Sequence, residues 1–340
     1  MRLGYNTGYW SSGPPSGAVE AVAEADRLGF EHIWTAEAYG SDALTPLAWW
    51  GANTTNVKLG TAIMQMSART PAATAMASLT LDHLSGGRFI AGIGASGPQV
   101  VEGWYGQSYS RPLERTREFV NIMRQIFHRE DTVAFEGKHY QLPFPHGTGL
   151  GKPLKSTVHP LRKDLPIYLA AEGPKNVALS AEICDGWLPL FFAPKDNDFY
   201  KSALQTGMDA SGLNTWDDFE VAATVSIIPG DDVEACADKL RPMLALYVGG
   251  MGAKGKNFHF DVFARMGFEA DCDKIQELYL AGNKAEAIAA VPTAMCEAIS
   301  LIGPADKIKD ELVMWDESVV NTLLISGPIS LVHFAADLIS

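Results

Sequence analysis

The amino-acid sequence predicts a (β/α)8 barrel with insertions, and three observations support this prediction. Short apolar runs of strand character alternate with amphipathic helical segments along the 340 residues. Eight such runs occur, and the length slightly exceeds the roughly 250 residues typical of the fold. The sequence shows no internal repeat and no low-complexity linker. We therefore expect one barrel domain over residues 1–340, with an open doubly wound sheet as the alternative.

The predicted strands and helices follow one another from end to end. Strands are expected at residues 2–6, 30–34, 57–63, 88–93, 166–170, 186–190, 219–228 and 322–326. Helices are expected at residues 16–28, 45–53, 71–84, 113–127, 176–183, 233–248 and 285–299, with a last helix from about residue 329. In the fourth of these helices, Phe119, Ile122 and Ile126 fall on one side, as in an amphipathic helix. Pro71 stands in the first turn of its helix, where proline is favoured.

Two stretches break this alternation and predict insertions near residues 129–165 and 229–320. The first contains glycine, proline and histidine with little periodicity. The second carries irregular sequence between its two predicted helices. Active sites of such barrels lie at the C-terminal ends of the strands. We expect the first insertion and the segment around residues 249–268 to shape the pocket there.

Composition indicates a globular, acidic protein. Hydrophobic residues make up 47% of the chain and charged residues 20%, with a net charge of −13. The acidic balance argues against nucleic acid and an anionic membrane surface as partners, although backbone N–H groups can still bind an anionic ligand. No run reaches 18 apolar residues, and the first residues do not resemble a signal peptide. The four cysteines form no C-x-x-C pair, so we expect buried reduced thiols and a cytoplasmic protein.

Residues 92–97 match the pattern G-x-G-x-x-G after a predicted strand. A dinucleotide site would need a helix opening at the third glycine and an acidic residue ending the next strand about 20 residues on. Instead Pro98 follows directly, and Arg115 and Glu118 lie inside a predicted helix. The pattern therefore argues against a nicotinamide-dependent dehydrogenase. A tight turn remains open, and we favour a turn that lets a cofactor approach the end of the strand.

Another charged cluster is interpreted as structural. Asp82, His83 and Arg88 precede the fourth predicted strand, which places them on the N-terminal face of the barrel. That face contributes to stability rather than catalysis. The eight histidines include no H-E-x-x-H or other metal-binding pattern, so no metal is expected.

An ordered series of motifs makes the prediction more specific. The series comprises T-A-I-M at 61–64, Pro71, L-D-H-L-S-G-G-R-F at 81–89, G-I-G at 92–94, P-I-Y-L-A-A-E-G at 166–173 and C-D-G-W-L-P at 184–189. It resembles the bacterial luciferase-like superfamily over essentially the whole chain, most weakly at 271–292. Residues 96–106, 115–118 and 247–252 resemble its coenzyme F420-dependent branch, which includes the methylenetetrahydromethanopterin reductases and actinobacterial relatives.

The resemblance implies where a flavin-like cofactor would lie. In the superfamily a non-prolyl cis peptide forms a bulge behind the ring, and it falls at Ala62–Ile63 here. Two loops would flank the phosphate-bearing arm. They contain Gly94, Ala95, Ser96 and Gly97 after the fourth strand and Ala171, Glu172, Gly173 and Asn176 at a helix start. The superfamily often has an arginine where Ala95 and Ser96 stand, so the resemblance implies coenzyme F420 more readily than FMN.

The resemblance also implies residues on the substrate side. Glu37, at the end of the second strand, would be the catalytic carboxylate, with a helix cap or salt bridge as the alternative. Relatives often carry histidine at the next position, and Ala38 replaces it here, so acid–base catalysis of that kind is not supported. Asn6 and Trp104 are expected to contact a small-molecule substrate.

Three hypotheses for function follow from the resemblance. The first is an F420-dependent oxidoreductase that transfers a hydride between the deazaflavin C5 and an unidentified organic substrate. The second is an FMN-dependent monooxygenase that works with a separate flavin reductase. The third is a barrel that binds flavin without catalysis. The superfamily usually forms homodimers, so a homodimer is expected.

Overall fold

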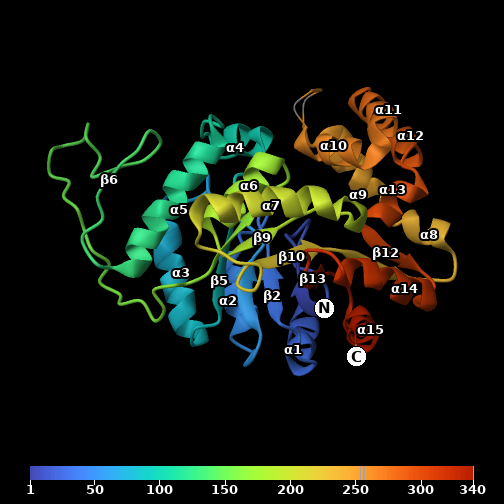
Figure 1. Ribbon diagram of the computed structural model, residues 1–340, viewed down its shortest axis with the longest axis horizontal. Coiled ribbons are helices and arrows are strands. Elements are labelled where there is room, and N and C mark those ends of the chain that lie inside the picture. Colours follow the sequence, from blue (N-terminus) through green and yellow to red (C-terminus); the bar gives the residue numbers. More distant parts are fainter. Residues whose placement is uncertain (253, 256, 340) are drawn as a thin grey trace.

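The computed structural model describes residues 1–252, 254–255 and 257–339, and these contain a closed barrel of eight parallel strands (Figure 1). The barrel strands are β1 (Arg2–Asn6), β2 (His32–Thr35), β3 (Lys58–Thr61), β5 (Phe89–Gly94), β8 (Ile167–Ala170), β9 (Gly186–Leu188), β10 (Glu220–Thr224) and β13 (Thr322–Ile325). Their order is β3-β2-β1-β13-β10-β9-β8-β5, and the pairing of β3 with β5 closes the ring. The prediction of a barrel is confirmed, and the open sheet is excluded.

The third predicted strand, 57–63, is interrupted. After β3, the Ala62–Ile63 peptide is cis, as the resemblance implied. The chain then resumes as β4 (Met64–Gln65), whose two residues pair with Ile93 and Gly94 of β5. One predicted strand is therefore two short strands on either side of a bulge.

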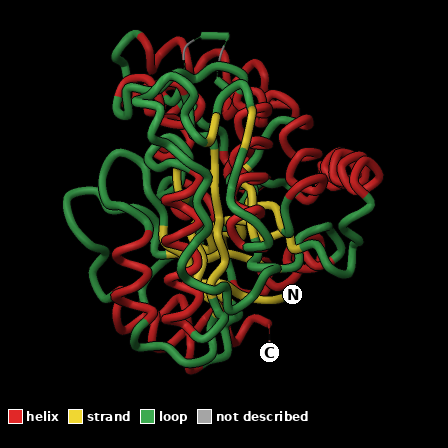
Figure 2. Tube along the Cα trace, turned by 90° about the vertical axis from the view of Figure 1, so that its left-hand side faces the viewer, coloured by secondary structure: helices red, strands yellow, loops and turns green. Residues whose placement is uncertain are grey.

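Helices surround the barrel, as Figure 2 shows. The outer helices are α1 (Ala18–Arg27), α2 (Leu44–Gly51), α3 (Pro71–Ser85), α5 (Pro112–His128), α6 (Pro174–Ile183), α7 (Asn197–Ser211), α14 (Ala305–Asp316) and α15 (Ile329–Ile339). The first turn of α3 contains Pro71, and the Thr70 hydroxyl caps it by accepting the N–H of Ala73 at 3.2 Å. No helix among the described residues is long and apolar enough to cross a membrane.

Two of these helices were not predicted. Helix α7 buries Tyr200, Leu204 and Met208, and α14 buries Ile308 and Leu312, so both have apolar residues at helical spacing. Residues 197–211 and 305–316 therefore carried the signal that was overlooked.

The insertion at 129–165 projects from the barrel at the left of Figure 1. It contains a small antiparallel pair, β6 (Phe135–Glu136) and β7 (Gln141–Leu142). The Glu118 carboxylate on α5 accepts the backbone N–H groups of Lys138, His139 and Tyr140 at 2.8, 2.9 and 3.0 Å. A carboxylate that caps three amides fixes this turn against α5.

The second insertion has its own apolar core. The predicted strand at 219–228 divides: β10 stays in the barrel, whereas β11 (Ser226–Pro229) leaves it and pairs in parallel with β12 (Ser300–Gly303). Between them lie α8 (Val233–Ala237), α9 (Arg241–Ala245), α10 (Phe258–Phe263), α11 (Glu269–Leu280), α12 (Lys284–Ala289) and α13 (Thr293–Ala298), with π-helical turns at Leu246–Gly250 and Ala264–Phe268. Prolines divide the two predicted helices, because Pro242 opens α9 and Pro292 precedes α13.

Large side chains fill the barrel interior. The rings of Trp34 and Tyr168 lie 5.9 Å apart between centroids. A Cβ added at Gly60 would lie 2.3 Å from the Trp34 ring, and one at Gly186 would lie 2.7 Å from the Tyr168 ring. Glycine is therefore required opposite each aromatic ring.

A polar cluster lies at the N-terminal end of this interior. The Glu220 carboxylate accepts the hydroxyls of Tyr168 and Thr322, each at 2.5 Å, and lies 3.6 Å from Nε2 of His32. Burial lowers the pKa of His32 to about 4, against a smaller opposing effect of Glu220. Burial raises the pKa of Glu220, but His32 and the two hydroxyls outweigh it and lower the pKa overall.

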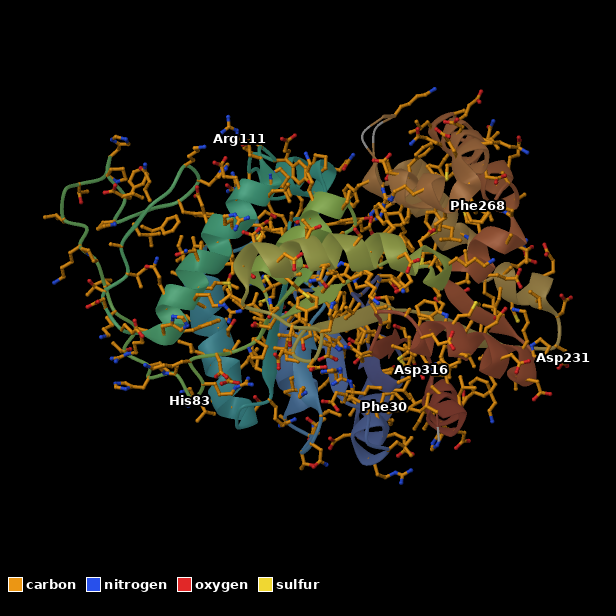
Figure 3. The ribbon with its side chains drawn as sticks, in the orientation of Figure 1. Phe30, His83, Arg111, Asp231, Phe268 and Asp316 are labelled. Atoms are coloured by element: carbon orange, nitrogen blue, oxygen red, sulfur yellow. The ribbon has the colours of Figure 1, made fainter. Side chains whose placement is uncertain are left out.

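The charged residues Asp82, His83 and Arg88 precede β5. In the interactions described, their side chains contact only neighbouring segments of the chain. Asp82 pairs with Arg162 at 2.5 Å, and Nε2 of His83 lies 2.7 Å from the carbonyl oxygen of His159. Arg88 donates to the Val57 carbonyl at 2.6 Å. Figure 3 shows His83 at the lower left of the molecule. The contacts of Asp82 and His83 join α3 to the end of the first insertion, and that of Arg88 joins the start of β5 to the residue before β3.

Candidate active site

A cavity of about 1020 Å³ opens where the barrel strands end. Most of the predicted site residues line it. These are Glu37, Ala62, Ile63, Gly94, Ala95, Ser96, Gly97, Trp104, Ala171, Glu172, Gly173 and Asn176. The second insertion adds Leu246, Tyr247, Gly250, Met251, Phe258 and His259 to the lining. The segment around 249–268 therefore shapes the pocket as expected, whereas the described lining includes no residue of 129–165, which contradicts that expectation.

Asn6 is not among the described lining residues. Its side-chain oxygen accepts the N–H of Gly8 at 2.9 Å, and its carbonyl accepts the Ser326 hydroxyl at 2.7 Å. An asparagine that bonds the backbone two residues on forms a local turn. The predicted substrate contact of Asn6 is therefore corrected to a role in the turn after β1.

The bulge at Ala62–Ile63 is held from β2. The N–H of Ala62 donates to the Thr35 carbonyl at 2.7 Å, and the N–H of Glu37 donates to the Ile63 carbonyl at 3.3 Å. Both bulge residues pack on the barrel interior and line the cavity. Backbone contacts from the neighbouring strand thus set where the bulge stands.

The carboxylate of Glu37 is buried and fully engaged. It forms a bidentate pair with Arg69 at 2.6 and 2.9 Å and accepts the N–H groups of Gln65 at 2.7 Å and Ala43 at 3.1 Å. Both oxygens hold two donors each, which leaves little capacity to take a proton from a substrate. The geometry supports the salt-bridge alternative: Glu37 positions β4 and the bulge. We call Glu37, Gln65, Arg69 and Ala62–Ile63 the barrel wall.

The glycine pattern at 92–97 serves close packing. A Cβ at Gly92 would lie 1.7 Å from the Thr61 carbonyl oxygen, and one at Gly94 would lie 2.8 Å from the Ile63 side chain. The Thr61 hydroxyl also donates to the Gly92 carbonyl at 2.8 Å. The first two glycines therefore let β5 approach β3 and the bulge, while Ser96 follows at φ +59° before α4 (Pro98–Gly103).

The loop after β8 meets the second insertion. Glu172 precedes Gly173, the N-cap of α6, and Pro174 opens that helix. Nδ1 of His259 lies 3.0 and 2.8 Å from the two Glu172 oxygens, and the side chains are 8% and 9% exposed. Arg265 donates to the Glu172 carbonyl at 3.1 Å. The strand end and the insertion are thus joined by a buried acid–imidazole pair.

The insertion holds His259 in place. Asn257 caps α10, accepting the N–H groups of His259 and Phe260 at 3.0 and 3.2 Å. Its amide donates to the Tyr247 and Val248 carbonyls, each at 2.8 Å, which ties α10 to the first π-helical turn. Burial, with a smaller effect of Tyr9, raises the pKa of Tyr247, so its phenol stays protonated. We call Glu172, Tyr247 and His259 the insertion wall.

Sequence reasoning missed His259 and Tyr247. An asparagine before an apolar run is a helix-start signal, so Asn257 could have placed His259 in a first helical turn. The direction in which that helical turn faces depends on the contact between His259 and Glu172, which are 87 positions apart in the sequence. Tyr247 lies in the segment 247–252 that resembles the F420-dependent branch, and the resemblance implied no role for it.

Comparisons with known proteins agree with this architecture. A model of the family described as luciferase-like monooxygenase matches residues 2–322. A Mycobacterium tuberculosis protein, provisionally named a coenzyme F420-dependent oxidoreductase, is 49% identical over 330 residues, which cover 96% of this chain and 95% of that protein.

The chain belongs to the luciferase-like monooxygenase family.

More distant members are similar over most of their length. The 5,10-methylenetetrahydromethanopterin reductase of Archaeoglobus fulgidus is 28% identical, covering 91% of this chain and 88% of that protein. The structure of the coenzyme F420-dependent tetrahydromethanopterin reductase of Methanopyrus kandleri superimposes with a TM-score of 0.82 at 22% identity, covering 98% and 97% of the two chains. That likeness shows the luciferase-like fold.

The position after Glu37 in this chain does not supply a histidine to the cavity. Ala38 stands there, and its carbonyl accepts the Tyr105 hydroxyl at 3.2 Å and the Gln65 amide at 3.0 Å. A histidine does line the cavity, but it is His259 of the insertion. This luciferase-like chain therefore presents its imidazole from the insertion.

Proposed function

We propose that the protein is a coenzyme F420-dependent oxidoreductase that transfers a hydride between the deazaflavin and a small organic substrate. The observation that carries the proposal is the cavity in which the Ala62–Ile63 bulge, the loop at 94–97 and the start of α6 line one continuous space. The 49% identity to a protein provisionally named as F420-dependent supports the choice of cofactor.

The residues present fit such a group. The bulge offers an apolar surface to a ring, and the loop at 94–97 has small residues whose backbone can approach an arm closely. The start of α6 would offer the backbone N–H groups of Gly173 and Lys175 and the side chain of Asn176 to a phosphate, whereas the N–H of Asn176 donates to the Gly173 carbonyl at 2.9 Å. When bound, a deazaflavin supplies hydride transfer at its C5 carbon.

The chain itself would orient the reactants and exclude water. The barrel wall fixes the bulge, and Ala62 and Ile63 would hold the ring against the end of β3. Trp104 is 65% exposed yet lines the cavity, which places its indole at the mouth. A substrate would contact Trp104, Leu246, Met251 and Phe258, and these apolar side chains suit an uncharged molecule.

Fluorescence titration of the cofactor-free protein with F420 and, separately, with FMN tests the proposal. We expect binding of F420 at micromolar or lower Kd, which corresponds to about −8 kcal/mol or better, and weaker binding of FMN. Preference for FMN would contradict the proposal and favour an oxygen-dependent monooxygenase supplied by a flavin reductase. Binding of both without turnover of any screened substrate would favour the non-catalytic barrel. The homodimer and the cytoplasmic location stay predictions.

A further inference from the structure

The cavity contains a negative charge where an anionic arm would lie. Glu172 stands one residue before the N-cap of α6, and its carboxylate lines the cavity with a side chain only 9% exposed. The neighbouring residues favour an anion through the backbone N–H groups of Gly173 and Lys175 and the exposed ammonium of Lys175. A carboxylate among them opposes that attraction.

The charge of Glu172 is only partly compensated. His259 contacts both carboxylate oxygens, whereas the Arg265 guanidinium is directed to the Glu172 carbonyl. Within the described residues, the Arg265 contact therefore orients the loop without pairing with the carboxylate. The Tyr247 phenol beside His259 stays neutral. A buried carboxylate that shares one imidazole keeps a repulsive effect on a nearby anion, because the low local dielectric weakens screening.

Such repulsion grows with the charge of the arm. FMN ends in a phosphate monoester, which is close to a dianion above pH 7. The phosphate of F420 is a diester and carries a single charge at that position. Riboflavin has no phosphate. For the phosphate group alone, the order of repulsion from Glu172 is therefore FMN, then F420, then riboflavin, because the other charges of F420 are carboxylates further along its tail.

We propose that Glu172, oriented by His259, is a specificity-determining residue that makes the cavity accept a phosphodiester arm and disfavour a phosphomonoester. The inference rests on the proposed function for its biological meaning. It concerns the insertion wall of this chain, however, and can be tested with free flavins whether or not F420 is the cofactor.

The test measures Kd at pH 8 for FMN, riboflavin, F420 and the deazaflavin riboside that lacks the phosphate. Glu172→Gln keeps the shape of the side chain and removes its charge. We expect this variant to bind FMN about tenfold more tightly, in line with removal of one nearby charge, and F420 a few-fold more tightly. Affinity for riboflavin and for the riboside should not change, because they lack the charged group.

Two further variants keep the test decisive. Asp198→Asn removes the same charge from an exposed position outside the described lining, and it should leave all four affinities unchanged. Lys175→Met removes a positive charge from the start of α6. It should weaken the binding of FMN without affecting the binding of riboflavin. Unchanged riboflavin binding also shows that each variant is folded.

Equal shifts for FMN and riboflavin in Glu172→Gln, or no shift, would overturn the inference. Failure of the wild-type protein to bind F420 or its riboside would overturn the proposed function instead. The FMN-to-riboflavin ratio would still decide the role of Glu172, so the two failures are distinguishable.

Discussion

The two walls of the cavity are built differently. In the barrel wall, the Glu37 carboxylate holds two backbone amides and a guanidinium, all within short segments that follow β2 and β3. In the insertion wall, the Glu172 carboxylate meets an imidazole that a separate helical core positions. The Glu37 carboxylate thus binds backbone N–H groups as well as a side chain, whereas the described contacts of the Glu172 carboxylate are with a side chain. The contrast teaches that the barrel fixes the position of the Ala62–Ile63 bulge, whereas the insertion supplies the imidazole on the opposite side of the cavity.

The largest effect is expected from Gly92→Ala. The new Cβ would lie 1.7 Å from the Thr61 carbonyl oxygen, so β5 and β3 must separate next to the bulge. We expect a loss of more than about 4 kcal/mol in the free energy of unfolding, measured by urea denaturation. Gly103→Ala is the matched control, since a Cβ there meets open space. Similar stability of the two variants would contradict the close-packing role of Gly92.

Glu37→Ala should follow in size. It leaves the Arg69 charge without its buried partner, which costs roughly 3–5 kcal/mol in the free energy of unfolding. It should also weaken F420 binding, because β4 and the bulge lose their anchor. Denaturation and F420 titration check both effects, and Glu172→Ala is the comparison. If both alanine variants lose equal stability, the two walls do not differ as described.

Acid should weaken the folded barrel through His32. The pKa of His32 is about 4 in the folded protein and about 6.5 in an unfolded chain. As the pH falls, the imidazole of His32 therefore binds a proton in the unfolded chain before it does so in the folded protein. The free energy of unfolding that is present above pH 6.5 is lost as the pH falls toward 4. Between pH 7 and pH 5 this amounts to about 2 kcal/mol. The lowered pKa of Glu220 acts in the same direction at lower pH.

Urea denaturation at a series of pH values measures this slope. His32→Gln replaces the titrating imidazole and should flatten the curve between pH 7 and pH 5. A variant curve as steep as that of the wild type would show that other groups cause the acid sensitivity.

The smallest effect on stability is expected for His259→Gln. Glutamine can still donate to Glu172, so the loss should be about 1 kcal/mol or less in the free energy of unfolding. The Kd of FMN should change more than that of riboflavin, because the orientation of the carboxylate changes. A loss as large as that of Glu37→Ala would make the insertion wall as strongly anchored as the barrel wall.

The sequence predicted the barrel well because its strands carry strong local signals. Residues 2–6 match β1, and the Ala62–Ile63 bulge followed from the resemblance. The helices of the second insertion were predicted poorly, since Pro242 and Pro292 divide them and their packing depends on contacts between residues distant in sequence. Twelve of the thirteen predicted site residues line the cavity, with Asn6 the exception. The pairing of Glu172 with His259 spans 87 positions, which no local pattern reveals.

The parallel pairing of β11 with β12 has a consequence for how such a protein can change. These two strands lie outside the barrel sheet, and Ser226 and Ser300 are register partners, so the strands that lead into and out of the helical segment run side by side. The helices between these strands pack around their own core. Replacement of the helices between β11 and β12 would therefore leave the barrel strands β10 and β13 in place, because the two flanking strands pair with each other. Relatives that differ in this segment would therefore present a different cavity wall on the same barrel strands.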